Sequence, residues 1–230
     1  MTGGMRTLLM KTAIELLYRS PFRRYALPRY TFGFTPQQLA FLCQCVERTR
    51  AVPGTVLEVG CARGYTTLFL NRFMDSAGIE KPYVCLDTFR GFLERDVAYE
   101  ADRRGKNRAD YRAYRVNSLR WFRGTMRASG IGRVRAIRGD AAEFDFATLG
   151  PIAFCLLDVD LYLPVHAALG RILDNLAPGG IVVVDDCDPG MAMFDGAEQA
   201  YREVAAGLPW PARIVLGKLG VLEKPVAVPA

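Results

Sequence analysis

The sequence predicts an α/β fold, with a doubly wound, mostly parallel sheet, helices on both of its faces and an antiparallel strand near the C-terminus. Three observations predict this fold. Short apolar runs alternate with longer stretches of helical periodicity along most of the 230 residues. The apolar runs have no polar face, which indicates strands that are buried on both sides. Two closing runs near the C-terminus are separated by only a few residues, as in a hairpin.

Length and composition set the broad class. Half of the residues are hydrophobic, so the chain can bury one full core, and a single domain is the simplest expectation. No window reaches about 18 uninterrupted apolar residues, so we expect no transmembrane helix. The N-terminus lacks a continuous apolar core with a cleavage site, and the six cysteines show no zinc-ligand spacing. We therefore expect a cytoplasmic protein with reduced thiols.

Two helices are predicted before the sheet begins. The first covers about residues 5–18. The second begins after Thr35, which suits the N-cap position, while Pro36 suits the first helical position and Gln38 completes a capping box. This second helix is expected to end near Arg48.

The main domain is expected over residues 51–230, with residues 1–50 as a helical extension. Residues 88–123 are too long for an ordinary strand-to-helix connection, and long insertions in compact domains are usually functional, so we expect them to form a lid. In chain order, the predicted elements of the domain are strand 55–59, helix 64–76, strand 83–86, strand 134–137, strand 153–157, helix 164–176, a turn at 178–180 into strand 181–184, helix 195–206, and strands 213–216 and 220–223. This order is typical of the class I methyltransferase fold (Rossmann-like), whose ligands lie beyond the carboxyl ends of the strands.

A glycine-containing loop follows the first predicted strand. The strand ends near Glu58, and the pattern Glu-x-Gly-x-x-x-Gly covers residues 58–64, directly before a helical pattern. The glycines would let a ligand approach the backbone, as in nucleoside-cofactor sites. The Gly-x-Gly pair of dinucleotide loops is missing, and a carboxylate suits an amino group and a sulfonium better than a pyrophosphate. The loop therefore predicts S-adenosylmethionine (SAM) as the cofactor.

Acidic residues also follow the next two predicted strands. Asp87 ends the second strand, where a carboxylate can bind both ribose hydroxyls, and Asp140 follows the third, where it can accept a hydrogen bond from the adenine amine. Each acid alone could be a helix cap, but acids at three strand ends strengthen the prediction of SAM. The residues that we expect to contact the cofactor are Glu58, Gly60, Cys61, Ala62, Arg63, Gly64, Thr66, Asp87, Thr88, Asp140, Ala141 and Asp158.

A second acidic group follows the last two parallel strands. Asp158 and Asp160 come directly after the fourth strand, and Asp185 and Asp186 directly after the fifth. Neighbouring strands lie about 5 Å apart, so four carboxylates are expected at one crevice, and neither segment contains a Lys or Arg. Like charges this close are unfavourable unless they share protons or bind a cation. The pattern favours a site for Mg²⁺, Mn²⁺ or Ca²⁺; the alternative is helix capping and solvation.

Four motifs, in this order, resemble the macrocin and mycinamicin type of sugar O-methyltransferase. They are Glu-Val-Gly-Cys-Ala-Arg-Gly (58–64), Leu-Asp-Thr-Phe-Arg-Gly-Phe (86–92), Asp-Val-Asp-Leu-Tyr (158–162) and Val-Asp-Asp (184–186). The resemblance extends over about residues 55–205. It implies methylation of a hydroxyl on a sugar or glycosylated small molecule, in natural-product (antibiotic) or glycolipid biosynthesis. It also implies SAM and a divalent metal, with Mg²⁺ as the first candidate.

The same resemblance implies a role for each acid of the second group. The residues that would hold the metal are Asp158, Asp185 and Asp186. Asp160 would be the general base, and it would need only to accept a proton that the metal has already made more acidic. Some family members use a histidine three residues after the first metal ligand, but here that position is Leu161. The only histidine, His166, is interpreted as a packing or surface residue of the following helix.

Positive charge is concentrated between residues 90 and 138, which contain fourteen Arg or Lys and five Asp or Glu, while the whole chain has a formal charge of +6. This segment is either a solvated face or a cover over an anionic or hydroxyl-rich substrate. Its aromatic residues can stack on rings of a ligand or pack on the core. We expect a glycosylated or polyhydroxylated small molecule as the partner, and no nucleic acid. A homo-oligomer stays an open alternative.

Two other functions stay open. One is a catechol-type or other small-molecule O-methyltransferase, although the usual Asp-x-Asp-Lys and Asp-Asn pairings are absent, as is the Asn/Asp-Pro-Pro-Tyr motif typical of nucleic-acid amino methylation. The other is a relative that binds SAM or a metal without methyl transfer. Release of S-adenosylhomocysteine with a sugar acceptor would separate the main prediction from this last alternative.

Overall fold

The computed structural model describes residues 3–22, 30–115 and 117–226. These residues belong to two units, one up to residue 32 and one from residue 33 onward. The first unit contains helix α1 (Gly3–Arg19), close to the predicted range, and its apolar side chains such as Leu8 and Leu16 are largely exposed. In the part of the chain that the structure describes, none of the helices has both the length and the apolar character needed to cross a membrane.

Helix α2 (Pro36–Arg48) belongs to the second unit and has the predicted N-terminus. The Thr35 hydroxyl accepts a hydrogen bond from the backbone N–H of Gln38 at 3.3 Å, and the Gln38 side chain accepts one from the Thr35 N–H at 2.8 Å. This reciprocal pair satisfies two donors that the first turn would otherwise leave free. The buried Leu42 and Val46 attach the helix to the core, which explains why α2 is part of this unit.

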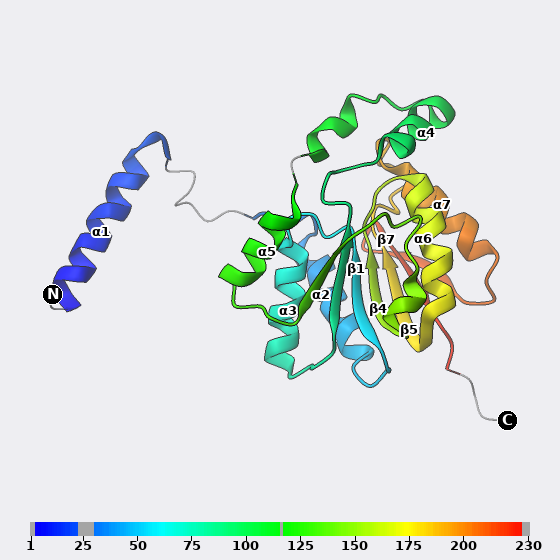
Figure 1. Ribbon diagram of the computed structural model, residues 1–230, viewed down its shortest axis with the longest axis horizontal. Coiled ribbons are helices and arrows are strands. Elements are labelled where there is room, and N and C mark those ends of the chain that lie inside the picture. Colours follow the sequence, from blue (N-terminus) through cyan, green and yellow to red (C-terminus); the bar gives the residue numbers. More distant parts are fainter. Residues whose placement is uncertain (1–2, 23–29, 116, 227–230) are drawn as a thin grey trace. The chain divides into compact units, whose positions relative to one another are not determined.

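The second unit is built on a seven-stranded sheet with the order β3-β2-β1-β4-β5-β7-β6 (Figure 1). The strands are β1 (Thr55–Val59), β2 (Tyr83–Asp87), β3 (Val134–Arg138), β4 (Ile152–Leu157), β5 (Leu176–Val184), β6 (Ala212–Val215) and β7 (Leu219–Glu223). Strands β1 to β5 pair in parallel, and β7 runs antiparallel to both β5 and β6. The strand order reverses between β1 and β4. The predicted doubly wound class I methyltransferase fold is therefore confirmed.

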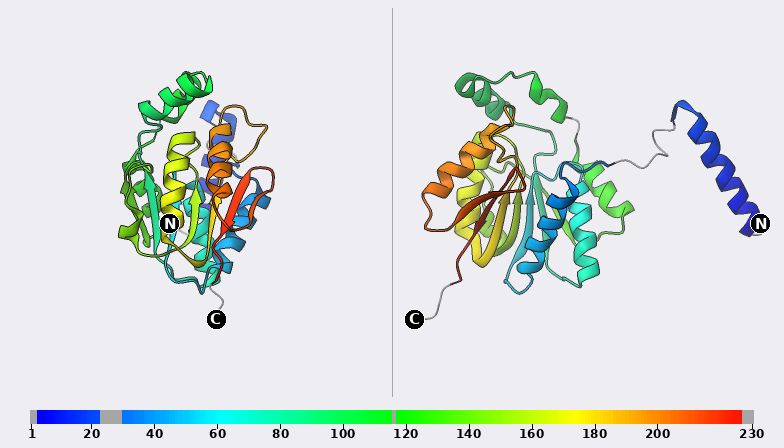
Figure 2. Two further views of the ribbon diagram at one scale, coloured as in Figure 1. Left: turned by 90° about the vertical axis from the view of Figure 1, so that its right-hand side faces the viewer. Right: turned by 180° about the vertical axis from the view of Figure 1, so that it is seen from behind.

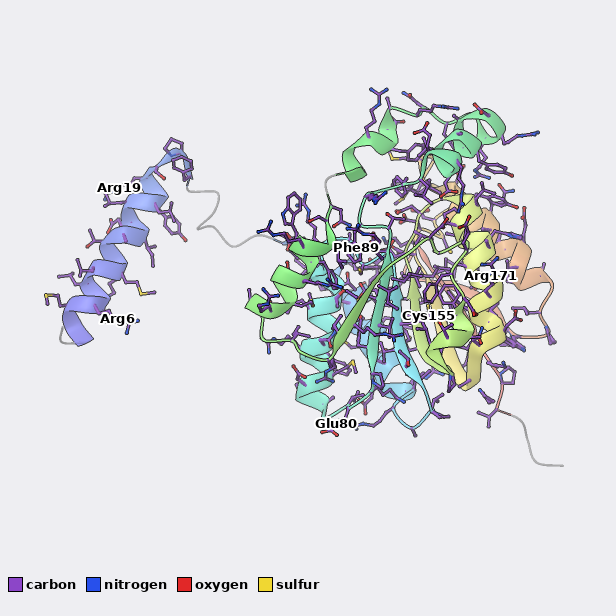
Figure 3. All side chains as sticks on the ribbon, viewed as in Figure 1. Arg6, Arg19, Glu80, Phe89, Cys155 and Arg171 are labelled. Atoms are coloured by element: carbon purple, nitrogen blue, oxygen red, sulfur yellow. The ribbon has the colours of Figure 1, made fainter. Side chains whose placement is uncertain are left out.

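Helices cover both faces of the sheet. Helices α2, α3 (Tyr65–Ala77) and α5 (Leu119–Ala128) lie on one side, and α6 (Tyr162–Asn175) and α7 (Asp195–Ala206) on the other (Figures 1 and 2). Every residue of β1 and β4 is buried, and Cys155 of β4 lies in the interior of the sheet (Figure 3). All six cysteines are free and buried. This two-sided burial explains the uninterrupted apolar runs of the sequence.

Strand β5 begins earlier than the sequence predicts. We predicted a turn at 178–180, but these residues lie inside the strand, where its register with β4 shifts between the pairs Ile152–Leu176 and Phe154–Ile181. The backbone there is hydrogen-bonded to the residue after β7: Gly179 N–H donates to Lys224 O at 2.8 Å, and Lys224 N–H donates to the carbonyl of residue 180 at 3.0 Å. The Pro-Gly-Gly sequence therefore forms a bulge within a paired strand and not a turn before it.

The segment 88–123 contains α4 (Glu94–Arg104), a short 3₁₀ helix (Asp110–Arg115) and the start of α5. Ion pairs connect it to α7: Arg104 lies 2.6 Å and Lys106 2.7 Å from the two carboxylate oxygens of Asp195. A small apolar cluster connects it to the residues just before α6 and α7. Its buried members are Val97, Tyr111, Leu161 and Phe194. Several of the basic and aromatic residues in this segment therefore hold it on the domain.

Candidate active site

The loop between β1 and α3 lies at the carboxyl edge of the sheet. Its first glycine, Gly60, has φ +91°, and a Cβ atom there would lie 1.7 Å from the backbone oxygen of Asp158. Its second glycine, Gly64, has φ +82°, and a Cβ atom would lie 2.7 Å from the Met126 side chain. We expected these glycines to make room for a ligand. In the direction of an added Cβ atom, the neighbouring protein segments already occupy the space, so both glycines are also required by the packing around the loop.

A first cavity, of about 660 Å³ including its open mouth, lies beside this loop. It is bounded by the residues that follow β1, β2, β3 and β4 and by part of the segment 88–123. The predicted cofactor residues that line it are Gly60, Ala62, Asp87, Thr88, Asp140, Ala141 and Asp158. The residues of the insertion that line it are Thr88, Gly91, Phe92, Leu93, Asp96 and Asn117. Ligand sites of small molecules commonly have this mixed polar and apolar lining.

A second cavity is lined by residues of the same loop. The predicted cofactor residues that line it are Glu58, Gly60, Cys61, Ala62, Arg63, Thr66 and Asp158. The two cavities share four lining residues: Gly60, Ala62, Asn117 and Asp158. Among the predicted cofactor residues only Gly64 lines neither. The two cavities are therefore two compartments that meet at one common wall.

Glu58 is held tightly by the protein. Its Oε2 accepts hydrogen bonds from the Thr67 hydroxyl at 2.6 Å and the Tyr83 hydroxyl at 2.7 Å, and the side chain is almost fully buried. Burial raises the pKa of this carboxyl to about 7, although both hydroxyl donors lower it. Glu58 therefore braces β1, α3 and β2 at the edge of the second cavity.

The other two predicted cofactor acids also have protein partners. Asp87 accepts hydrogen bonds from the backbone N–H of Ala62 at 2.8 Å and of Phe89 at 2.6 Å, and burial raises its pKa. Asp140 is paired with the guanidinium of Arg95, on α4. Both acids line the first cavity, their hydrogen bonds fix the loops around them, and Arg95 connects Asp140 to the insertion.

The structure brings three of the four clustered aspartates together. Asp158, Asp160 and Asp186 each offer a carboxylate oxygen within 4.8 Å of the others. Asp160 has φ +61° and Asp186 has φ +56°, which is the left-handed region that Asp tolerates better than most residues and that often occurs at functional sites. The resemblance implied Asp158, Asp185 and Asp186 as the metal ligands. Asp158 and Asp186 belong to the group that the structure brings together, but the third member of that group is Asp160 and not Asp185.

Asp185 shares a cationic partner with Asp186 and lies closer to it. The Lys218 ammonium lies 2.7 Å from Asp185 Oδ2 and 3.3 Å from Asp186 Oδ1, and it also lies over the ring of Phe34, 4.8 Å from its centre. The sequence analysis missed Lys218, because it is far along the chain, in the turn between β6 and β7. The pairing of β7 with β5 is the signal that could have found it, since a hairpin partner of β5 returns its turn to the strand end at Val184.

The electrostatics of this group favour a further positive charge. Burial and the neighbouring carboxylates raise the pKa values of Asp158 and Asp160 well above the usual range, while Lys218 opposes the shift. Burial and Asp186 raise the pKa of Asp185 to about 6. Asp185 Oδ1 is buried and has no hydrogen-bond partner among the described residues. A set of clustered carboxylate oxygens with one oxygen unsatisfied fits a hard divalent cation.

The insertion is also attached to the acidic segment itself. The buried carboxylate of Glu100, on α4, accepts a hydrogen bond from the backbone N–H of Tyr162 at 2.8 Å. The rings of Tyr99 and Tyr162 are stacked, with centres 5.5 Å apart and planes 9° apart. The position of α4 is therefore coupled to the residues directly after Asp160. His166 is half exposed on α6, 3.9 Å from Glu203, and lines neither cavity.

Known proteins resemble this chain in sequence. The macrocin-O-methyltransferase (TylF) family matches residues 26–209. A relative from Streptomyces olivaceus, the 8-demethyl-8-(2,3-dimethoxy-alpha-L-rhamnosyl)-tetracenomycin-C 4'-O-methyltransferase, is 29% identical over 156 residues. That alignment covers 65% of this chain and 60% of the relative, so the chain spans about three-fifths of the relative's length.

Solved structures share the fold. The O-methyltransferase NovP has 21% sequence identity and a TM-score of 0.70, with 82% of this chain and 80% of that chain covered. CalS11, a calicheamicin methyltransferase, has 21% identity and a TM-score of 0.68, with 97% of this chain and 94% of that chain covered. These likenesses extend over most of both chains and support the class I methyltransferase architecture.

Proposed function

The chain belongs to the macrocin-O-methyltransferase family, and we propose that it transfers the methyl group of SAM to a hydroxyl of a sugar or glycosylated small molecule, assisted by a divalent cation. The observation that carries this proposal is the group formed by Asp158, Asp160 and Asp186, of which Asp158 lines both cavities and Asp160 lines the first. A methyl acceptor bound there would have both a cation site and a proton acceptor beside the cofactor.

The two cavities suit the two halves of SAM. In the proposed arrangement, the first cavity takes the adenosine, with Asp87 near the ribose and Asp140 and Ala141 near the adenine. The second cavity takes the methionine part, where Arg63 can pair with its carboxylate and Thr66 lies at the start of α3. The reacting methyl group would then lie near Asp158, which lines both cavities. SAM supplies a methyl group on a positively charged sulfur, a good leaving group.

Asp158 and Asp186 would hold the divalent cation. Both belong to the group of three aspartates that the structure brings together, and both are metal ligands according to the family resemblance. Such a cation, for which Mg²⁺ is the first candidate, would lower the pKa of a hydroxyl bound to it. The positive charge of the cation would also compensate the negative charge of the clustered carboxylates. Of the four clustered carboxylates, two pair with the Lys218 ammonium, those of Asp185 and Asp186, and both the cation and the sulfonium would offset the remaining negative charge.

Asp160 is the proposed base. Its carboxylate accepts the proton of the attacking hydroxyl, which leaves an oxygen lone pair to form the new bond to the methyl carbon. The carbon–sulfur bond breaks and its electron pair remains on sulfur, so that S-adenosylhomocysteine is the second product. Glu100 acts at a distance from this chemistry: its hydrogen bond to the Tyr162 N–H fixes the backbone that follows Asp160.

The segment 88–123 is the proposed lid. Several of its residues line the first cavity, and its attachments to α6 and α7 hold it above the strand ends. A cover of this kind excludes water from the reacting groups, which strengthens the electrostatic interactions at the site.

A glycosylated natural product is the proposed acceptor, as in antibiotic biosynthesis. The relative from Streptomyces olivaceus is named for a rhamnosyl 4'-hydroxyl, and the polar strand ends here suit a hydroxyl-rich ring. Nucleic acid is a poor alternative, because several cations of the basic segment are paired with the protein's own carboxylates. These cations are Arg95, Arg104, Lys106, Arg108 and Arg133.

The test combines binding with turnover. SAM binding is measured by calorimetry, first with EDTA and then with Mg²⁺, and S-adenosylhomocysteine release is then screened over glycosylated acceptors. Binding of SAM together with Mg²⁺-dependent release on a sugar acceptor supports the proposal. Tight binding without turnover on any acceptor would instead indicate a SAM-binding protein that does not transfer methyl groups. Turnover at the same rate with and without EDTA would show that the reaction does not need the cation.

A further inference from the structure

Asn117 lies in the wall that both cavities share. It belongs to the insertion, just before α5, and the sequence analysis gave it no role. Its side-chain oxygen is buried and has no hydrogen-bond partner among the described residues. A buried amide oxygen without a partner destabilises the folded protein, and most buried polar groups in folded proteins have a partner. The missing partner of Asn117 therefore needs an explanation.

Two other buried oxygens lack a partner in the described part of the chain, and each has a different context. Asn71 is anchored through its Nδ2, which donates to the Thr67 carbonyl at 2.8 Å, and it lines neither cavity. Asp185 is anchored by Lys218. The side chain of Asn117 has no anchoring hydrogen bond within the described residues, and it lines both cavities. The arrangement points to a partner supplied by a ligand.

The position of Asn117 is fixed by the helix that follows it. Ser118 is the N-cap of α5, where its hydroxyl accepts a hydrogen bond from the Trp121 N–H at 3.2 Å. Phe122 and Met126 of α5 are buried beside Gly64. The amide is thus held next to the β1–α3 loop by a capped and packed helix, which suits a residue that recognises a ligand.

We propose that Asn117 binds the cofactor, with its amide oxygen accepting a hydrogen bond from a ribose hydroxyl. This inference rests on the proposed function, because it assumes that SAM occupies both cavities. The donors of SAM are the adenine amine, the two ribose hydroxyls and the ammonium. The adenine and the ammonium lie at opposite ends of the molecule and the ribose lies between them. A residue in the wall common to both cavities therefore meets the ribose.

The experiment measures affinity by calorimetry with S-adenosylhomocysteine, which binds without turnover. Asn117→Ala is compared with the wild type and with Asn107→Ala. Asn107 is an exposed asparagine of the same insertion that lines neither cavity and accepts a hydrogen bond from the Ala109 N–H. We expect Asn117→Ala to bind about five- to fifteenfold more weakly, the factor that corresponds to one hydrogen bond, and Asn107→Ala to bind as the wild type does. Thermal unfolding of each variant checks that it is folded.

Two smaller ligands identify the donor. With 5'-methylthioadenosine, which lacks the amino-acid part, the loss in Asn117→Ala should persist. With its 2',3'-dideoxy form, which lacks both ribose hydroxyls, wild type and variant should bind equally. A loss that disappears already with 5'-methylthioadenosine, or that persists with the dideoxy form, overturns the assignment to the ribose.

The outcomes also separate this inference from the proposed function. Unchanged affinity of Asn117→Ala for S-adenosylhomocysteine overturns the inference, whether or not the KM for an acceptor rises. Failure of the wild type to bind S-adenosylhomocysteine at all overturns the proposed function instead.

Discussion

Lys218 and Asp185 form a buried ion pair, with the ammonium 2.7 Å from the carboxylate, at the point where the hairpin of β6 and β7 meets the end of β5. The ion pair involves the carboxylate of Asp185, which family resemblance implies as a metal ligand. It also places a fixed positive charge beside the three gathered aspartates. A divalent cation at those aspartates would therefore be repelled by Lys218 and attracted by the carboxylates, and its affinity depends on the balance.

Removing the charge of Lys218 should tighten cation binding. In Lys218→Met the acidic group loses its only ammonium partner among the described residues but keeps its four carboxylates, so the attraction for a divalent cation grows. We expect about tenfold tighter binding of Mn²⁺, equivalent to about 1.4 kcal/mol, measured by calorimetry. Lys218→Arg keeps the charge and should bind as the wild type does. Weaker binding in Lys218→Met would show that the lysine orients the aspartates for the cation and does not compete with it.

Two conservative variants separate a cation ligand from a base. Asp158→Asn should lose cation-dependent turnover and cation affinity while SAM affinity stays close to that of the wild type. Asp160→Asn should keep cation affinity within about threefold and lose turnover by a factor of about 10² to 10⁴, the usual contribution of a general base. Cation titration and initial rates on each variant make the test. If Asp160→Asn loses the cation as completely as Asp158→Asn does, Asp160 is a ligand, and the proton must go to another group.

The sequence was sufficient to predict the parts of the site that lie at the carboxyl ends of parallel strands. In a parallel sheet all the strand ends meet at one edge, so acids after successive apolar runs had to be neighbours, and Asp158, Asp160 and Asp186 are. The positions of strand ends do not predict which side chains come to the site from turns or insertions. Lys218 comes from a hairpin turn, and Asn117 from an insertion whose path depends on its own small core. The bulge in β5 was missed because Pro-Gly-Gly is a turn signal, and the hydrogen bonds that override it come from residue 224.

Glu58 should make the stability of the protein depend on pH. Its pKa is about 7 in the folded protein against 4.5 as the ordinary value. Below pH 4.5 the carboxyl is protonated in both states. Between pH 4.5 and 7 the unfolded chain releases the proton first, so stability falls as pH rises, and above pH 7 the loss is complete. The loss from this group is about 3 kcal/mol.

Glu58→Gln should remove that loss. The amide oxygen can still accept hydrogen bonds from Thr67 and Tyr83, but the side chain has no proton to release. Urea unfolding at pH 5, 6, 7 and 8 should therefore give a flatter profile for the variant than for the wild type. Glu80→Gln changes an exposed glutamate and should leave the wild-type profile unchanged. Parallel profiles for wild type and Glu58→Gln would mean that Glu58 stays ionised throughout and that its hydroxyl partners outweigh its burial.

Gly60→Ala tests whether the first loop glycine serves the protein or a ligand. Alanine at φ +91° is strained, and its Cβ would lie 1.7 Å from the Asp158 oxygen, so the ends of β1 and β4 would have to separate. We expect a loss of more than about 3 kcal/mol in the free energy of unfolding, or no folded protein. Gly124→Ala, in α5 with no atom near the added Cβ, should be neutral or more stable by about 0.5–1 kcal/mol. If Gly60→Ala instead unfolds like the wild type and fails only to bind SAM, the loop must have room for the methyl group in the free protein. The glycine would then exist for the approach of the cofactor, as the sequence motif alone suggests.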